Sequence, residues 1–97
     1  MHCVRVALFQ LKPGMMEKYK EVTEIMSPKI ESRPGFRRVT FFTDAATDQC
    51  GAFVEWETEA DAHAAASDLE PKAVEMTADF VTKPPYFHQF VAYKTEE

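Results

Sequence analysis

Four stretches of the chain place apolar residues at every second position, and a period of two is typical of β-strands. They cover residues 3–11, 36–43, 50–56 and 86–94. In the third stretch, Ala52, Val54 and Trp56 point to one face while Phe53 points to the other. Because apolar bulk is found on both faces, we expect neither side of the resulting sheet to be fully solvated.

Between the first two strands the apolar period changes to that of a helix, from Met15 to about Ser32. Apolar residues recur there at spacings of three and four, which places them on one face. They are Met15, Tyr19, Val22, Met26 and Ile30. Pro28 lies inside this pattern, and because the period continues to Ile30 we expect the proline to kink the helix rather than to end it.

The segment after the third strand predicts a helix split into two parts. Thr58 is a candidate N-cap, and the alanine-rich run of residues 60–66 forms helix readily. These small side chains either bring the helix close to the sheet or leave a gap beside it. Asp68 and Pro71 are typical of a second helix start, with Lys83-Pro84-Pro85 as the stop. The apolar face of the second part comprises Ala73, Met76, Thr77 and Phe80.

The predicted order β-α-β-β-α-β is that of an α+β, ferredoxin-like split βαβ fold, formed by residues 1–97 as a single domain. Right-handed crossovers place the first and third strands in the middle of a four-stranded antiparallel sheet, with the helices on one face. The other face would carry apolar side chains such as Phe42, Phe53 and Phe87. An uncovered apolar face on a small chain indicates an interface, so we expect a homodimer that packs sheet against sheet.

Composition narrows the possible partners. The 97 residues carry 11 Lys and Arg against 16 Asp and Glu, a net charge of −5, which argues against nucleic-acid binding. No apolar run approaches the roughly 20 residues of a membrane span, so no membrane partner is expected. The N-terminus is typical of a strand rather than a signal peptide, which favours the cytoplasm.

Two cysteines do not form a disulfide framework, and we expect Cys3 and Cys50 to be reduced thiols. They would lie near one another if the strands that they begin run parallel and adjacent. His2 is nearby in sequence, but no ligand spacing supports a metal site, and none is expected.

Several turn motifs resemble those of the antibiotic biosynthesis monooxygenase (ABM) family of dimeric α+β barrels. They are Pro13-Gly14, Pro34-Gly35-Phe36, Trp56-Glu57-Thr58-Glu59-Ala60 and Pro84-Pro85. The resemblance covers nearly the whole chain. It implies a pocket between the sheet and the helices of each subunit, and an oxygenase that needs no cofactor and acts on an aromatic or quinol-type molecule.

The resemblance also argues against one activity of the family. Its haem-degrading members use an asparagine on the first strand, a tryptophan on the split helix and a histidine on the last helix. The corresponding regions here contain Arg5 or Ala7, residues 64–66, and Glu75 or Met76. Haem degradation is therefore not expected.

An oxygenase without a cofactor needs a base that forms the substrate anion and a donor that holds the developing oxyanion. His63 and His88 have the right pKa range for the base. The other interpretation of His63 is a surface histidine on a helix. For His88 it is a core or interface histidine with a hydrogen-bond partner.

Five further side chains are candidates for binding a small aromatic or apolar ligand: Trp56, Tyr86, Met76, Phe80 and Tyr19. Each also fits a packing or edge position, and the Met76–Phe80 stripe fits a core helix face. Arg5 is a charge within the first strand and must find a partner, for which Glu55 is the nearest candidate. Its functional interpretation is a clamp for a substrate anion.

Two hypotheses follow. The first is a cofactor-independent monooxygenase-like enzyme acting on a small aromatic or quinol-type substrate. The second is a non-catalytic homodimeric domain of the same fold that binds a small ligand or serves assembly. A cavity of several hundred cubic ångströms holding a histidine beside Trp56 would favour the enzyme.

Overall fold

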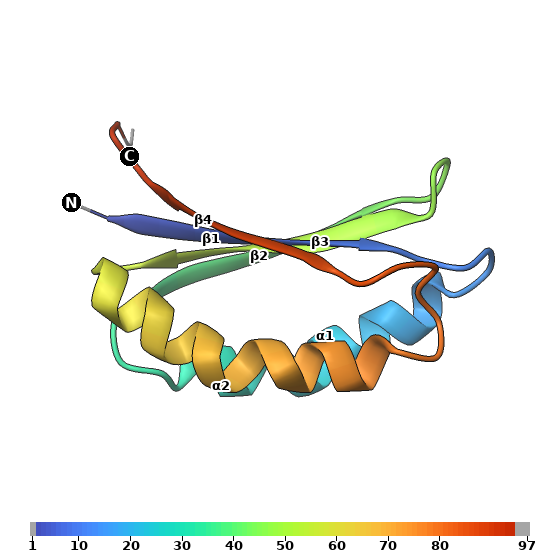
Figure 1. Ribbon diagram of the computed structural model, residues 1–97, viewed down its shortest axis with the longest axis horizontal. Helices are drawn as coiled ribbons and strands as arrows, with labels where there is room; N and C mark the ends of the chain where they lie inside the picture. The colour runs from blue at the N-terminus through green and yellow to red at the C-terminus, as the bar shows by residue number, and fades with distance from the viewer. Residues whose placement is uncertain (1, 95–97) are drawn as a thin grey trace.

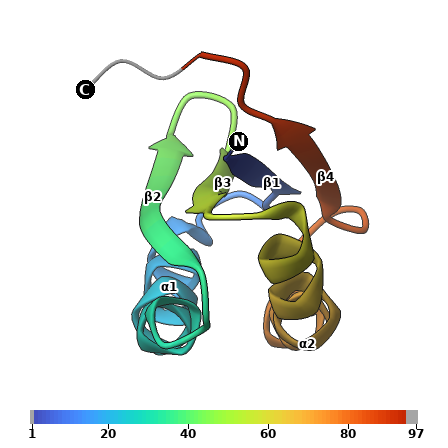
Figure 2. The ribbon, with the colours of Figure 1, turned by 90° about the vertical axis from the view of Figure 1, so that its left-hand side faces the viewer.

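The computed structural model describes residues 2–94 and confirms the predicted β-α-β-β-α-β order. The elements are β1 (Cys3–Gln10), α1 (Met16–Glu31), β2 (Phe36–Asp44), β3 (Gln49–Trp56), α2 (Glu59–Thr77) and β4 (Tyr86–Val91). Both helices lie side by side on one face of the sheet, so the molecule has two layers (Figures 1 and 2).

The four strands form one antiparallel sheet in the order β2-β3-β1-β4. The two central strands are β1 and β3, as predicted. Ala7 of β1 lies opposite Ala52 of β3 on one side and opposite Phe87 of β4 on the other. This register fixes which residues face the helices, because side chains alternate between the two faces along every strand.

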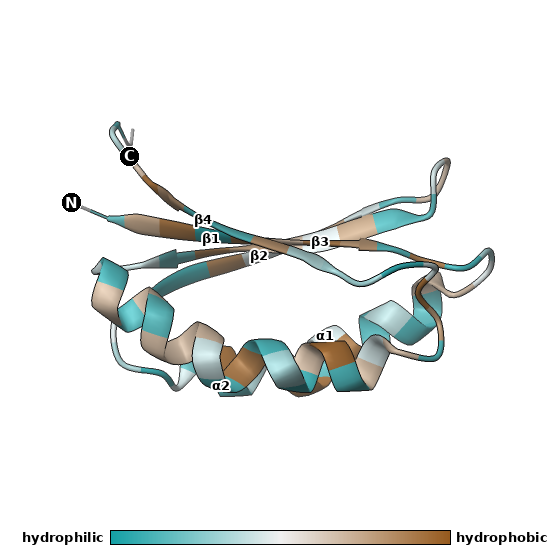
Figure 3. Ribbon diagram, in the orientation of Figure 1, coloured by the Kyte–Doolittle hydropathy of each residue, from teal (hydrophilic) through white to brown (hydrophobic). Residues whose placement is uncertain are grey.

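The face of the sheet that is covered by the helices, here called the inner face, carries most of the core. One buried cluster gathers around Trp56, whose ring meets that of Phe36 edge to face at 6.1 Å. A second cluster gathers around Phe9 and Tyr19, whose ring centroids are 5.7 Å apart. Figure 3 shows apolar and polar residues alternating along the strands above the two amphipathic helices.

Two of the turn motifs noted in the sequence meet at one end of the sheet. Gly35 has a φ of +81°, and a Cβ there would come within 2.2 Å of the Asp61 carboxylate, so this turn requires glycine. The carbonyl of Gly35 accepts a 2.8 Å hydrogen bond from the backbone of Glu57. Thr58 then caps α2, because its hydroxyl accepts a hydrogen bond from the Asp61 N–H at 3.1 Å.

The prediction of a split second helix was wrong. Helix α2 is continuous from Glu59 to Thr77 with Pro71 inside it. Asp68 does not cap a new helix; its carboxylate lies 2.9 Å from Arg33 and 3.6 Å from Lys72. One buried stripe runs through both halves, through Ala62, Ala65, Leu69 and Thr77. Burial of that stripe offsets the roughly 3 kcal/mol that an interior proline costs a helix.

Helix α1 continues past Pro28 to Glu31, as the spacing to Ile30 predicted. The cysteines were misplaced, because β1 and β3 run antiparallel. Cys3 lies opposite Trp56, whereas Cys50 lies opposite Phe9, about 20 Å further along β1. Both are buried free thiols.

The uncovered face of the sheet, here called the outer face, carries Phe42 and Phe53 as predicted, but not Phe87. Phe87 is an inner-face residue, and its ring meets that of Phe9 edge to face at 6.2 Å. Leu8, Tyr86 and Phe90 add to the outer face and are 43%, 52% and 49% exposed.

Candidate functional site

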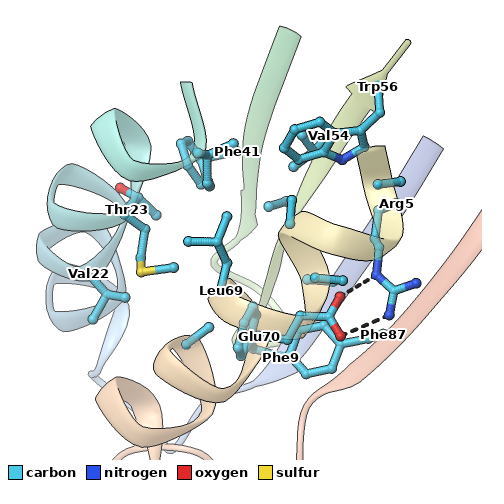
Figure 4. A pocket seen from close by; sticks show the side chains of 18 of the residues that line it. Arg5, Phe9, Val22, Thr23, Phe41, Val54, Trp56, Leu69, Glu70 and Phe87 are labelled. Carbon is cyan, nitrogen blue, oxygen red and sulfur yellow. Dashed lines mark hydrogen bonds and ion pairs between the residues drawn. The ribbon is translucent and has the colours of Figure 1, made fainter. Parts of the chain in front are cut away.

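An apolar pocket lies between the sheet and the two helices (Figure 4). Its volume is about 90 Å³. The strands contribute mainly aromatic and small side chains to it, namely Ala7, Phe9, Phe41, Ala52, Val54, Trp56 and Phe87. The pocket is therefore lined by residues from every element of the fold, and its walls are almost entirely apolar.

Alanines of α2 create this space. Ala62, Ala65, Ala66 and Ala73 line the pocket at helical spacing, and Leu69 lies among them. Their methyl groups fill little of the layer between helix and sheet. The alanine-rich run predicted either close packing of the helix on the sheet or a gap beside it, and the structure has the gap.

One charged pair stands in the pocket wall. The Arg5 guanidinium donates from Nε and Nη2 to the two carboxylate oxygens of Glu70 on α2, the second contact at 2.8 Å. Its Nη1 donates to Gln89 Oε1 on β4 at 3.0 Å. Arg5 and Glu70 are the two formally charged residues among those that line the pocket, and Figure 4 shows their paired contact beside Phe87.

The hydrogen bonds to Glu70 raise the pKa of Arg5, so the guanidinium stays charged despite its partial burial. The predicted partner of Arg5, Glu55, was wrong. Arg5 lies opposite Val54 and faces the helices, whereas Glu55 points to the outer face. There Glu55 is 5% exposed and accepts a 2.9 Å hydrogen bond from Arg37.

Reasoning from the sequence missed Glu70 and Gln89. Glu70 follows Leu69 on the stripe of α2 that faces the sheet, four residues after Ala66. An unbroken helical period through Pro71 would have placed it there. Gln89 lies two residues after Phe87 and shares the inner face of β4 with it. The period of two along this strand already indicated that position.

Tyr19, one of the predicted ligand-binding residues, lines the pocket, but its hydroxyl already donates a hydrogen bond. It donates to the carbonyl of Gly51, and burial raises the pKa of Tyr19 above its ordinary value. A phenol has a single proton to donate. Tyr19 therefore serves as a wall of the pocket rather than as an oxyanion donor in this arrangement.

Trp56 also lines the pocket, whereas Met76 and Phe80 do not. Met76 packs against the cluster around Trp56. Phe80 lies beyond the end of α2 and is buried with Phe9 and Tyr19. The structure thus brings together two of the five predicted ligand-binding residues.

Neither predicted base lines the pocket. His63 is exposed on α2. His88 is exposed on the outer face of β4, where its ring stacks on Tyr86 at 6.0 Å and meets Phe90 at 4.5 Å. Tyr86 therefore lies on the face away from the pocket. A catalytic role for either histidine stays a prediction.

Within residues 2–94, no group of three or more His, Cys, Asp and Glu side chains is arranged to hold a metal ion. Burial raises the pKa of Cys50 to about 12 and also raises that of Cys3, so both thiols are poor ligands and poor nucleophiles. Over the same residues, no helix has the length and apolar character needed to cross a membrane.

Neither a protein-family model nor a curated protein sequence matches the chain. Solved structures do match it over nearly its whole length. A putative antibiotic biosynthesis monooxygenase from Nitrosomonas europaea has a TM-score of 0.80 at 18% identity, covering 95% of this chain and 90% of its own.

SnoaB, a cofactor-independent oxygenase from Streptomyces nogalater, has a TM-score of 0.78 at 18% identity, covering 97% of this chain and 95% of its own. NE2512, a protein of unknown function from Nitrosomonas europaea, has a TM-score of 0.83 at 14% identity, covering 99% and 93%. At these identities the likeness establishes the fold, as the turn motifs predicted: the chain has the fold of the antibiotic biosynthesis monooxygenases.

Proposed function

We propose that the protein is a monooxygenase-like enzyme that acts without a cofactor on a small aromatic, quinol-type molecule bound between its sheet and its helices. The observation that carries this proposal is an apolar pocket between the sheet and the helices whose wall includes one positively charged side chain, Arg5, paired with Glu70. The fold shared with SnoaB, itself a cofactor-independent oxygenase, supports the reaction class.

Such a reaction makes few demands on the protein. One quinol and one dioxygen give one hydroxyquinone and one water, so the substrate supplies all the electrons. The protein must exclude water, favour the substrate anion and hold its oxygen. Phe9, Trp56 and Phe87 supply apolar walls, and Arg5 supplies a cation beside them.

The size of the pocket restricts the substrate. Its volume of about 90 Å³ is below the roughly 300–1,000 Å³ of pockets for drug-sized ligands. It is closer to the cavity of about 150 Å³ that takes up one benzene molecule. We therefore expect single-ring hydroquinones to be better substrates than three-ring anthrones.

The base of this reaction is proposed to be His63 or His88, as the sequence suggested. Because both lie outside the pocket, each would need a route for the proton through water or through a rearranged chain. The test is oxygen uptake with a panel of hydroquinones and anthrones, for the wild type and for His63→Ala and His88→Ala. Equal rates of oxygen uptake in all three proteins would exclude both histidines as the base. No oxygen uptake with any substrate would contradict the proposed enzymatic activity.

A second function is favoured by the position of the histidines. The pocket has a volume of about 90 Å³ and no histidine lines it, so it does not meet the condition that would have favoured the enzyme, a cavity of several hundred cubic ångströms with a histidine beside Trp56. It fits a non-catalytic domain that binds a small apolar ligand. In that case, binding of a hydroquinone would be detected by calorimetry without any consumption of oxygen. Oxygen uptake that saturates with the same ligand would instead support the enzyme.

For the assembly we propose a homodimer that packs outer face against outer face. Leu8, Phe42, Tyr86 and Phe90 are each more than a third exposed on this face, which is costly for a free monomer. Multi-angle light scattering is expected to give twice the chain mass of 11.1 kDa at micromolar concentration. A stable particle of the single mass would contradict the dimer.

A further inference from the structure

We propose that the pocket selects ring compounds bearing an anionic oxygen, with Arg5 as the anion site and Glu70 as an internal competitor for it. The inference rests on the proposed use of the pocket as a ligand site and deepens it by naming the substrate class. A hydroquinone ionised at one hydroxyl and a benzoate both belong to this class.

The geometry around Arg5 is that of a site for an anion. Two of its nitrogens meet both oxygens of the Glu70 carboxylate, the paired contact that a guanidinium makes best. Gln89 holds the third nitrogen at 3.0 Å from the neighbouring strand. The guanidinium is therefore oriented from two sides, and its plane is fixed where a ligand oxygen would arrive.

Glu70 is placed so that it can leave. Its side chain is 21% exposed and that of Arg5 is 22% exposed, so the pair lies between the pocket and water. A ligand carboxylate that replaces Glu70 keeps the charge at Arg5 balanced, while Glu70 turns toward solvent and is rehydrated. A neutral ligand offers no such exchange, because Arg5 would lose a charged partner.

This exchange also serves the proposed chemistry. A quinol reacts with oxygen through its anion, and a cation beside the hydroxyl lowers the pKa of that hydroxyl. Arg5 thereby makes the substrate easier to deprotonate, which reduces what is required of the base. A role of this kind needs the guanidinium to face the ligand once Glu70 has left, and Arg5 stands in the pocket wall, next to that space.

The test is direct binding of two ligands of the same shape, benzoate and benzamide. Trp56 is the single tryptophan of the chain and lines the pocket, so its emission reports on occupancy without any need for turnover. We expect benzoate to bind the wild type about tenfold or more tightly than benzamide. The advantage of benzoate should shrink as salt is added.

Two variants are expected to move benzoate binding in opposite directions. Arg5→Met should weaken it about tenfold or more, because the anion loses its partner. Glu70→Gln should strengthen it severalfold, because the competing charge is removed. Benzamide affinity should stay constant in both variants, which shows that the pocket is still formed. Exposed Lys18→Met and Glu75→Gln make the same charge changes elsewhere and should have no effect.

Equal binding of benzoate to the wild type and Arg5→Met, or an unchanged affinity in Glu70→Gln, would overturn the inference. Absence of binding for both ligands in every variant would overturn it as well. This outcome is separate from the proposed reaction. If the protein binds benzoate tightly but takes up no oxygen with any hydroquinone, the enzyme is rejected and the anion site is retained.

Discussion

The two faces of the sheet differ in how far their apolar side chains are buried. On the inner face, Phe9 and Trp56 are buried under the helices and border a pocket. On the outer face, Leu8 and Phe90 are about half exposed although they are equally apolar. Each residue of a strand points to one face only, so a substitution can alter one face and leave the side chains of the other face in place.

Apolar side chains of the same strands therefore lie in two different environments. The inner face is covered by the chain's own helices, and the alanines of α2 leave a pocket between helix and sheet. Nothing within residues 2–94 covers the outer face, and in our proposal a second copy of the chain packs against it. Our two proposals place ligand binding and assembly on opposite sides of the same four strands.

The strongest way to test the comparison is to truncate one large side chain on each face. Trp56→Ala removes a buried indole and should lower the free energy of unfolding by about 3–5 kcal/mol. Phe90→Ala removes a half-exposed ring and should lower it by only about 0.5 kcal/mol at low protein concentration. Urea denaturation measures both, and equal losses would contradict the distinction.

A smaller loss of stability is expected from a substitution at Gly51, where the outer face is crowded. A Cβ on Gly51 would come within 2.2 Å of the Ala7 carbonyl oxygen and 2.6 Å of the Phe42 ring. Gly51→Ala should therefore cost about 1–3 kcal/mol. Adding Phe42→Ala should recover part of that loss, because it removes the ring but not the backbone contact. Full stability of the single variant would show that the strands have more space than the structure indicates.

The smallest effect concerns pH and the inner face. Burial raises the pKa of Cys50 from 9.0 to about 12, so the folded chain holds this proton more tightly than the unfolded chain. The resulting stability is complete below pH 9 and is lost as the pH rises toward 12. After allowing for solvent screening, we expect a loss of about 1 kcal/mol by pH 10.5.

Cys50→Ala should show a smaller decline between pH 8 and pH 10.5 than the wild type, measured by urea midpoints at each pH. The variant is less stable at neutral pH because it loses a buried side chain, so the comparison uses the slope rather than the absolute value. Parallel slopes would mean that the Cys50 thiol does not resist ionisation in the folded protein.

Much of the fold follows from the sequence because strand and helix periods are local signals. The four strands, the central position of β1 and β3, and the Thr58 cap of α2 were all predicted. The predicted split of α2 was wrong. Asp68 and Pro71 are strong local signals for a helix start, but burial of the stripe on both sides of them keeps the helix continuous. Local rules do not weigh a proline against a stripe of buried side chains on both sides of it.

The site was less predictable, because it depends on which distant residues meet. Trp56 and Tyr19 line the pocket, and their role in ligand binding stays a prediction, whereas the pairing of Arg5 with Glu70 joins residues 65 positions apart. The error on α2 carried over, because a helix restarted at Asp68 has no fixed face on which to place Glu70. His63 and His88 were chosen for their pKa range, which says nothing about the direction in which a side chain points.

The most direct test of the account uses the three leucines of the chain as methyl probes in an NMR titration with benzoate. Leu69 lines the pocket, Leu8 lies on the outer face, and Leu11 is buried in the core. We predict that the Leu69 methyl signals shift as benzoate saturates the protein while those of Leu8 and Leu11 stay in place. Saturable shifts of Leu8 with an unmoved Leu69 would place the ligand on the wrong face and contradict the account.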